Sequence, residues 1–275
     1  MPELPETETI ARDLDRELKA ARIQSVNVVR PDVLRGVDAA ELAARVADTT
    51  IVRCWRRAKL VVIDLSTGDR VVVQPRFTGA LLIDTGALPE RERRYATIEF
   101  RLADGRALVY RDIRRLGTVA LMNPERFDAY AGTLGIEPLD PAFTAAHLSA
   151  LVRVSKRTIK QVLMDQTVIA GVGNIYANEA LWRAGIDPSR ESATIGPDDA
   201  GALRDGIVGV LTESIARRGT SFRDYRDARG ERGGFVEHLA VYGRGGEPCR
   251  RCGRRLVETH AIDGRTTVLC VHCQK

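Results

Sequence analysis

Four cysteines near the C-terminus constrain the fold of this chain more than any other feature. Cys249-x2-Cys252 and Cys270-x2-Cys273 form two pairs that are separated by 17 residues. Two such pairs at this separation are typical of a zinc site in which four thiolates hold the ion tetrahedrally. The segment between the pairs must then fold back as a hairpin. Because four thiolates leave no open coordination position, we expect a structural zinc that takes no part in chemistry.

Length and charge narrow the class of protein. A chain of 275 residues can bury a sizeable core and favours two domains. Its formal net charge is +5 with a sequence pI of about 9.1, which permits nucleic-acid binding without proving it. We find no apolar stretch long enough to span a membrane and no signal pattern at the N-terminus. We therefore expect a cytosolic protein with no membrane partner, in which Cys54 is an ordinary buried thiol.

The first half of the chain has the pattern of one helix followed by many short strands. Ile10, Leu14 and Leu18 recur at helical spacing and predict a helix that ends near Ala21. Short β-branched runs follow, with tight turns between several of them, at 26–29, 60–63, 71–73, 97–100 and 107–110. This regular spacing predicts a β-sandwich or barrel.

The second half is helical. A Gly/Pro-rich stretch at 132–141 is interpreted as a linker. Helices are predicted at 155–164, 175–183 and 197–218, and residues 219–247 are rich in glycine and charge, as in a mobile loop. We place the predicted β-sandwich domain at 1–133, the helical domain at 134–243 and the four-cysteine zinc finger at 244–275.

The N-terminus offers a candidate nucleophile. Removal of Met1 would expose the secondary amine of Pro2, and an α-amine titrates near pH 8, well below a lysine. Such an amine can attack an electrophilic sugar carbon and form a Schiff base, with Glu3 beside it to shuttle a proton. The alternative is that Pro2 is only a favourable residue for starting a helix. The N-terminus alone does not decide between these interpretations.

A glycine-rich turn in the helical half is a candidate phosphate site. Residues 169–176 lead from one predicted helix into a second that starts near Asn174. Backbone N–H groups at a helix N-terminus bind phosphate well, and Lys156, Arg157 and Lys160 can add positive charge. Alone, this pattern also fits an ordinary helical hairpin. A basic zinc hairpin in the same chain favours DNA binding.

Taken together, these motifs resemble bacterial formamidopyrimidine-DNA glycosylase, in the family that also contains endonuclease VIII. The resemblance runs from end to end, and Leu4 favours the formamidopyrimidine branch, since endonuclease VIII typically has glycine there. Its anchors, besides the four cysteines, are Pro2-Glu-Leu-Pro-Glu6, Arg56-Arg-Ala-Lys59, Arg111-Asp-Ile-Arg-Arg-Leu-Gly117, Met164-Asp165 with Ile169 to Ala177, and Val241-Tyr-Gly-Arg244.

The resemblance implies an α+β fold. An N-terminal helix and antiparallel β-sandwich would precede a helix–two-turn–helix domain with a four-cysteine zinc finger, and damaged double-stranded DNA would run in the cleft between them. The implied activity is excision of an oxidised purine, such as 8-oxoguanine or a formamidopyrimidine, followed by β/δ-elimination at the abasic site. A monomer that needs no nucleotide cofactor is expected.

The resemblance also assigns roles to individual residues. Pro2 would attack C1′, Glu3 would act as acid and base on the sugar, and Lys59 would contact a phosphate or assist proton transfer. Arg265 would grip the phosphate at the lesion. A loop around 219–235 would cover the extruded base. Further DNA-contacting positions are expected at Glu6, Phe77, Tyr95, Arg114, Leu116, Lys156, Lys160, Asn174 and Tyr242.

The chain departs from its family at several of these positions. This branch typically fills the gap left by the extruded base with a Met, an Arg and a Phe. The corresponding positions here are Phe77, Arg114 and Leu116, in that order. Both apolar side chains can still wedge between base steps. Tyr95 lies near where relatives carry a DNA-contacting histidine. The finger spacing is one residue longer than usual, before Arg265.

These departures leave two alternative functions open. One is a glycosylase for oxidised pyrimidines, similar to endonuclease VIII, or an enzyme that cleaves abasic sites only. The other is a non-catalytic lesion-binding protein, against which the presence of Pro2 and Glu3 argues.

Overall fold

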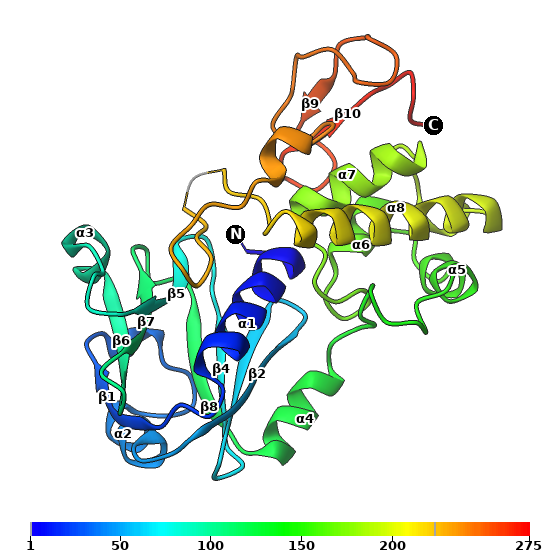
Figure 1. Cartoon of the computed structure of the whole chain (residues 1–275). Coiled ribbons are helices and arrows are strands. Elements are labelled where there is room, and N and C mark those ends of the chain that lie inside the picture. The colour runs from blue at the N-terminus through cyan, green and yellow to red at the C-terminus, as the bar shows by residue number, and fades with distance from the viewer. Residues whose placement is uncertain (1, 223) are drawn as a thin grey trace. The chain divides into compact units, whose positions relative to one another are not determined.

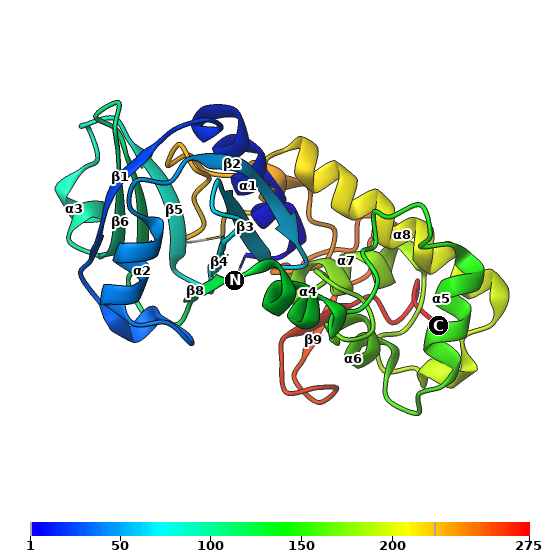
Figure 2. The same cartoon turned by 90° about the horizontal axis from the view of Figure 1, so that it is seen from below.

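The computed structural model describes residues 2–222 and 224–275, which fall into two compact units (Figures 1 and 2). The first comprises Met1–Gly132 and Arg217–Gly234, and the second comprises Thr133–Ala216 and Phe235–Lys275. Within the described residues, none of the helices has the length and apolar character that crossing a membrane requires.

The N-terminal unit opens with helix α1 (Leu4–Leu18), which packs on strands β2 and β3 (Figure 1). Ile10, Leu14 and Leu18 are fully buried, as their spacing predicts, and Leu4 is fully buried as well. The helix ends three residues before the expected position. Ala20 adopts a left-handed backbone with φ of 67°, which α-helical residues cannot have.

Behind α1 lie two antiparallel four-stranded sheets. One has the order β1 (Ile23–Val28), β6 (Ala96–Leu102), β7 (Ala107–Asp112), β5 (Gly79–Asp84). The other has the order β2 (Ile51–Arg57), β3 (Leu60–Leu65), β4 (Arg70–Gln74), β8 (Thr118–Met122). Side chains from both sheets share one core, which includes Val61 and Ile63 from β3 and Ile98 and Phe100 from β6. The predicted sandwich is confirmed.

Short helices complete this unit. They are α2 (Ala39–Val46), which packs on β1 (Figure 2), α3 (Glu90–Arg93), α4 (Pro124–Gly132) and the 3₁₀ turn η1 (Pro31–Val33).

The C-terminal unit contains helices and a small finger. Its elements are α5 (Ala145–Arg153), α6 (Ile159–Met164), α7 (Asn174–Ala184), η2 (Ser192–Thr194), α8 (Pro197–Ala216), η3 (Phe235–His238), β9 (Val257–Thr259) and β10 (Thr267–Leu269). Helices α7 and α8 pack side by side (Figures 1 and 2). Gly206 permits their close approach, because a Cβ there would lie 2.8 Å from the carbonyl oxygen of Ala180.

The segment Arg217–Gly234 packs with the N-terminal unit. Most of it falls in the mobile loop that the sequence predicts at 219–247, within the predicted domain 134–243. Tyr225 and Ala228 are buried in the sandwich core. The Ile83 N–H of edge strand β5 donates to the Ala228 carbonyl at 2.9 Å. The segment therefore supplies a hydrogen-bond acceptor to the otherwise unpaired edge of the sheet. This contact explains why so polar a stretch packs against the sandwich.

Candidate functional site

The start of α1 is held in place by the Glu6 carboxylate. Pro2, Glu3 and Glu6 are all buried. One Glu6 oxygen accepts the Glu3 backbone N–H at 2.8 Å, and the other accepts the Thr220 N–H at 2.7 Å. Glu6 therefore joins the candidate nucleophile's neighbour to the segment Arg217–Gly234.

Lys59 lies at the tip of the β2–β3 hairpin, and this tip contacts the beginning of α1. The two-residue turn places Ala58 at φ of 52°, and the Thr7 hydroxyl donates to the Ala58 carbonyl at 3.4 Å. Arg56 pairs with Glu8 at 2.7 Å, which ties the same hairpin to the second turn of the helix. The Lys59 side chain is buried, with 7% exposure. The fold thus brings the hairpin tip that carries Lys59 to the first turn of α1, which follows Pro2 and Glu3 directly in the chain.

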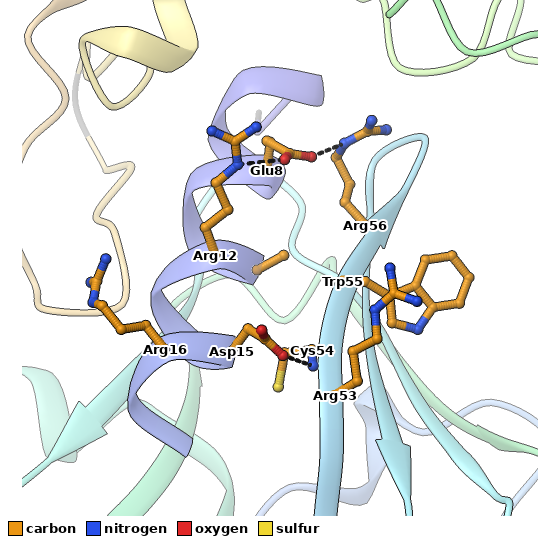
Figure 3. A pocket seen from close by; sticks show the side chains of 9 residues that line it. Glu8, Arg12, Asp15, Arg16, Arg53, Cys54, Trp55 and Arg56 are labelled. Atoms are coloured by element: carbon orange, nitrogen blue, oxygen red, sulfur yellow. Dashed lines mark hydrogen bonds and ion pairs between the residues drawn. The ribbon is translucent and has the colours of Figure 1, made fainter. Parts of the chain in front are cut away.

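A basic groove of about 380 Å³ lies further along α1, facing β2 (Figure 3). Glu8 bonds to both Arg12 and Arg56 here, and the Cys54 N–H donates to Asp15 at 2.7 Å. Burial, and next the negative charge of Asp15, raises the pKa of the Cys54 thiol. Cys54 is therefore inert as a nucleophile, and the groove contains none of the predicted site residues.

The candidate wedge residues stand exposed on two loops of the sandwich. Phe77 and Leu116 are 44% and 40% exposed. The Arg114 guanidinium lies 5.0 Å from the centre of the Phe77 ring. Exposed apolar side chains with a cation beside them are suited to insertion between stacked bases.

Asp112 joins these two loops, although the sequence reasoning did not single it out. Its buried carboxylate accepts the Thr78 hydroxyl at 2.5 Å, the Gly117 N–H at 2.8 Å and the Arg114 N–H at 3.2 Å. One carboxylate thus fixes the residue after Phe77 and both neighbours of the Arg115–Leu116 pair. An aspartate inside the motif 111–117 is the only sequence signal for this role.

Tyr95 lies just before β6, next to the same motif. Its carbonyl accepts the Asp112 N–H at 3.1 Å, and the Arg94 guanidinium lies 4.7 Å from the centre of its ring. Its side chain is half-buried.

In the C-terminal unit, the start of α7 and the finger hairpin carry two predicted residues side by side. The Asn174 amide donates to the Thr266 carbonyl at 3.0 Å. Arg265, the preceding residue, is exposed, and its backbone N–H donates to the Asp263 carboxylate at 3.0 Å. Asn178, one turn after Asn174, accepts the N–H of the β10 residue Val268 at 2.8 Å. Helix α7 therefore holds the hairpin that presents Arg265.

Lys160 does not take the position expected of a phosphate contact. Its side chain is fully buried, with Nζ at 2.7 Å from the Thr267 hydroxyl and 3.2 Å from the Asp263 carboxylate. The Asp263 side chain is also buried and needs a cationic partner, which Lys160 supplies. Lys160 therefore stabilises the loop that carries Arg265. Lys156, by contrast, is exposed.

Tyr242 is positioned by a second residue that the sequence reasoning missed. The buried Glu179 carboxylate accepts the N–H groups of Ala240, Val241 and Tyr242 at 2.8–2.9 Å. Burial raises the pKa of Glu179, and the three N–H donors oppose that rise. Tyr242 itself is half-buried at this anchored segment.

The four cysteines of the finger fit a zinc ion. The Sγ atoms of Cys249, Cys252, Cys270 and Cys273 all lie within 4.8 Å of one another. Tetrahedral Zn–S bonds of about 2.3 Å place sulfur atoms roughly 3.8 Å apart. The ring of Trp182 packs against this cluster, and its buried indole N–H lies beside the Cys249 sulfur without a well-formed hydrogen bond among the described residues. A zinc-bound thiolate of Cys249 would be a strong acceptor for this N–H.

Three family models together match most of the chain. The formamidopyrimidine-DNA glycosylase N-terminal domain matches residues 1–119, its H2TH domain matches residues 134–226, and the zinc finger found in FPG and IleRS matches residues 246–275. The chain belongs to the formamidopyrimidine-DNA glycosylase family. Members are DNA glycosylases of base-excision repair that also have AP lyase activity, so the predicted family and enzyme class are confirmed.

Individual relatives agree over the full length. The formamidopyrimidine-DNA glycosylase of Pelotomaculum thermopropionicum is 39% identical, over 100% of this chain and 99% of the relative. That of Moorella thermoacetica is 43% identical over 93% of each chain. A Lactococcus lactis FPG mutant solved with Fapy-dG-containing DNA has a TM-score of 0.92 at 30% identity, with 100% of both chains covered. The Thermus thermophilus MutM (FPG) protein has a TM-score of 0.87 at 32% identity, over 99% of this chain and 98% of the other.

Proposed function

We propose that this enzyme removes oxidised purines, 8-oxoguanine and formamidopyrimidines, from double-stranded DNA and then cleaves the strand. The observation that carries the proposal is the buried Glu6 carboxylate, which binds the Glu3 N–H and the Thr220 N–H together. It fixes the Pro2–Glu3 terminus against a segment that can cover a base. The substrate class follows the names of the relatives, including Lactococcus lactis FPG solved with Fapy-dG DNA.

The proposed chemistry uses the amine of Pro2 after removal of Met1. Its lone pair forms a bond to C1′ while the glycosidic bond breaks, and the base leaves with a proton. Ring opening then gives an iminium ion, in which C2′ becomes acidic. Loss of a C2′ proton expels the 3′ phosphate, and a second elimination expels the 5′ phosphate. Glu3 moves protons on the sugar, and Lys59 holds a phosphate or assists a proton transfer.

The partner in this proposal is damaged double-stranded DNA. Phe77 and Leu116 fill the gap left by the extruded base, next to Arg114. Glu6 borders the base, and phosphate and further backbone contacts come from Tyr95, Lys156, Asn174, Tyr242 and Arg265. Zinc in the finger holds the hairpin of Arg265 and supplies no catalytic group. The enzyme acts as a monomer without a nucleotide cofactor, on DNA in the bacterial cytoplasm.

The test compares three duplexes under single-turnover conditions, carrying 8-oxoguanine opposite cytosine, thymine glycol, or an abasic site. We expect excision of 8-oxoguanine to be faster than excision of thymine glycol. Pro2→Gly, or a tag that blocks the N-terminus, should abolish base excision. A clear preference for thymine glycol would replace the purine assignment with the pyrimidine one. Full excision by the blocked protein would exclude Pro2 as the nucleophile.

A further inference from the structure

Arg218 forms a largely buried cluster with two aspartates in the N-terminal unit. Its Nε donates to the Asp227 carboxylate at 2.9 Å, and its Nη2 bonds to both Asp227 and Asp13. The Asp13 and Asp227 side chains are 2% and 0% exposed. Asp13 has a second partner in Arg16, at 2.7 Å. Because a buried carboxylate is costly without a cation, Asp227 depends on Arg218.

These contacts close the base of the segment Arg217–Gly234. The second Asp227 oxygen accepts the N–H groups of Arg229 and Glu231, each at 2.9 Å. The Gly234 N–H donates to the Arg217 carbonyl at 2.9 Å, which joins the two ends of the segment. Arg218 therefore links the start of the segment, the turn near residue 230 and, through Asp13, helix α1.

The anchored segment reaches the catalytic terminus two residues after Arg218. The Thr220 N–H donates to Glu6, whose other oxygen accepts the Glu3 N–H. Phe222, further along the segment, is 41% exposed. The base of the segment is thus fixed, while an aromatic side chain beyond it is presented outward.

We infer that Arg218 is a positioning residue for base excision, which holds this segment on α1 so that it covers the extruded base beside Pro2 and Glu3. The inference rests on the proposed function. An abasic site has no base to cover, so its cleavage does not need the segment in place. Loss of the Arg218 guanidinium should therefore separate the two activities of the enzyme.

Arg218→Gly removes the guanidinium without straining the backbone, because Arg218 already has a φ of 63°, which glycine adopts freely. We expect single-turnover excision of 8-oxoguanine to fall roughly 10- to 100-fold, the scale of a small misplacement in an active site. Cleavage of a preformed abasic site should stay within about two-fold of the unmodified enzyme. The matched control is Arg229→Ala in the same segment, whose pair with Glu17 is exposed. Equal losses in both reactions, or no loss of excision, would overturn the inference.

Amide hydrogen exchange of the free enzyme tests the anchor without using activity. The amides of Thr220 and Glu231 should exchange faster in Arg218→Gly than in the unmodified enzyme or in Arg229→Ala. Unchanged exchange at both amides would show that Arg218 does not hold the segment. If the unmodified enzyme cleaves abasic DNA but excises no oxidised purine, the proposed substrate fails, and the exchange result still decides the role of Arg218.

Discussion

Replacement of the buried Lys160 should destabilise the C-terminal unit far more than replacement of an exposed cation. Lys160→Met keeps an unbranched side chain as far as Cε but removes the ammonium group that contacts Asp263 and Thr267. Asp263 has a side chain with only 6% exposure, so its carboxylate would lose its cationic partner while staying buried. Breaking a buried pair from one side typically costs about 3–5 kcal/mol. We expect the free energy of unfolding of this unit to fall by about 3 kcal/mol.

The chain allows this unit to be followed alone. It has two tryptophans, Trp55 in the N-terminal unit and Trp182 in the C-terminal unit. In a Trp55→Phe background, tryptophan emission during guanidinium unfolding reports the C-terminal unit only. The control is Arg183→Met, which breaks the more exposed pair with Glu213 and should cost at most about 1 kcal/mol.

A double-mutant cycle identifies the source of the loss. Asp263→Asn removes the carboxylate charge, so Lys160→Met should cost less in that background than in the unmodified chain. A loss of unfolding free energy in Lys160→Met no larger than that in the Arg183→Met control would show that Lys160 is not a buried structural cation.

Three further predictions concern the wedge, its support and the finger. Phe77→Ala should change the free energy of unfolding by no more than about 0.5 kcal/mol, because the side chain is half exposed. The same substitution should slow single-turnover excision of 8-oxoguanine about ten-fold. Unchanged excision would show that Phe77 is not a wedge residue. Asp112→Ala should lower the free energy of unfolding of the N-terminal unit by about 2–4 kcal/mol, because buried donors lose their acceptor. Trp55 emission during unfolding in a Trp182→Phe background measures this loss. A loss below about 1 kcal/mol would contradict the structural role of Asp112. Removal of zinc by a chelator should change Trp182 emission and weaken DNA binding, and added zinc should restore both. Trp182 emission that is the same with and without zinc would contradict the proposed contact between the indole and a zinc-bound thiolate.

Local patterns predicted the parts of the fold that local physics determines. The spacing of Ile10, Leu14 and Leu18 gave α1, and valine-rich runs gave β3 and β4. Strand β2 escaped prediction because Arg53 and Arg56 interrupt its apolar pattern. The cysteine spacing predicted the four-cysteine cluster, because two closely spaced pairs are enough to define it.

Contacts between distant residues account for what the sequence did not reveal. The segment Arg217–Gly234 has the composition of a loop, but Arg218 meets Asp13 across 205 positions of the sequence. Lys160 has the charge of a surface residue, yet its partner Asp263 lies 103 positions away. Asp112 accepts the hydroxyl of Thr78 from another loop, and Glu179 accepts backbone N–H groups from residues 240–242; nothing near either carboxylate in the sequence shows which partner it has. In each case, the charge of the residue could be read but its burial could not.

Borohydride trapping on an abasic duplex and on an 8-oxoguanine duplex, with mass spectrometry of the trapped peptide, tests directly whether Pro2 is the nucleophile. We expect a covalent complex on both duplexes, with the adduct on the N-terminal amine of Pro2 in protein from which Met1 has been removed. An adduct on Lys59 or another lysine, or no adduct despite a free Pro2 amine, would contradict it.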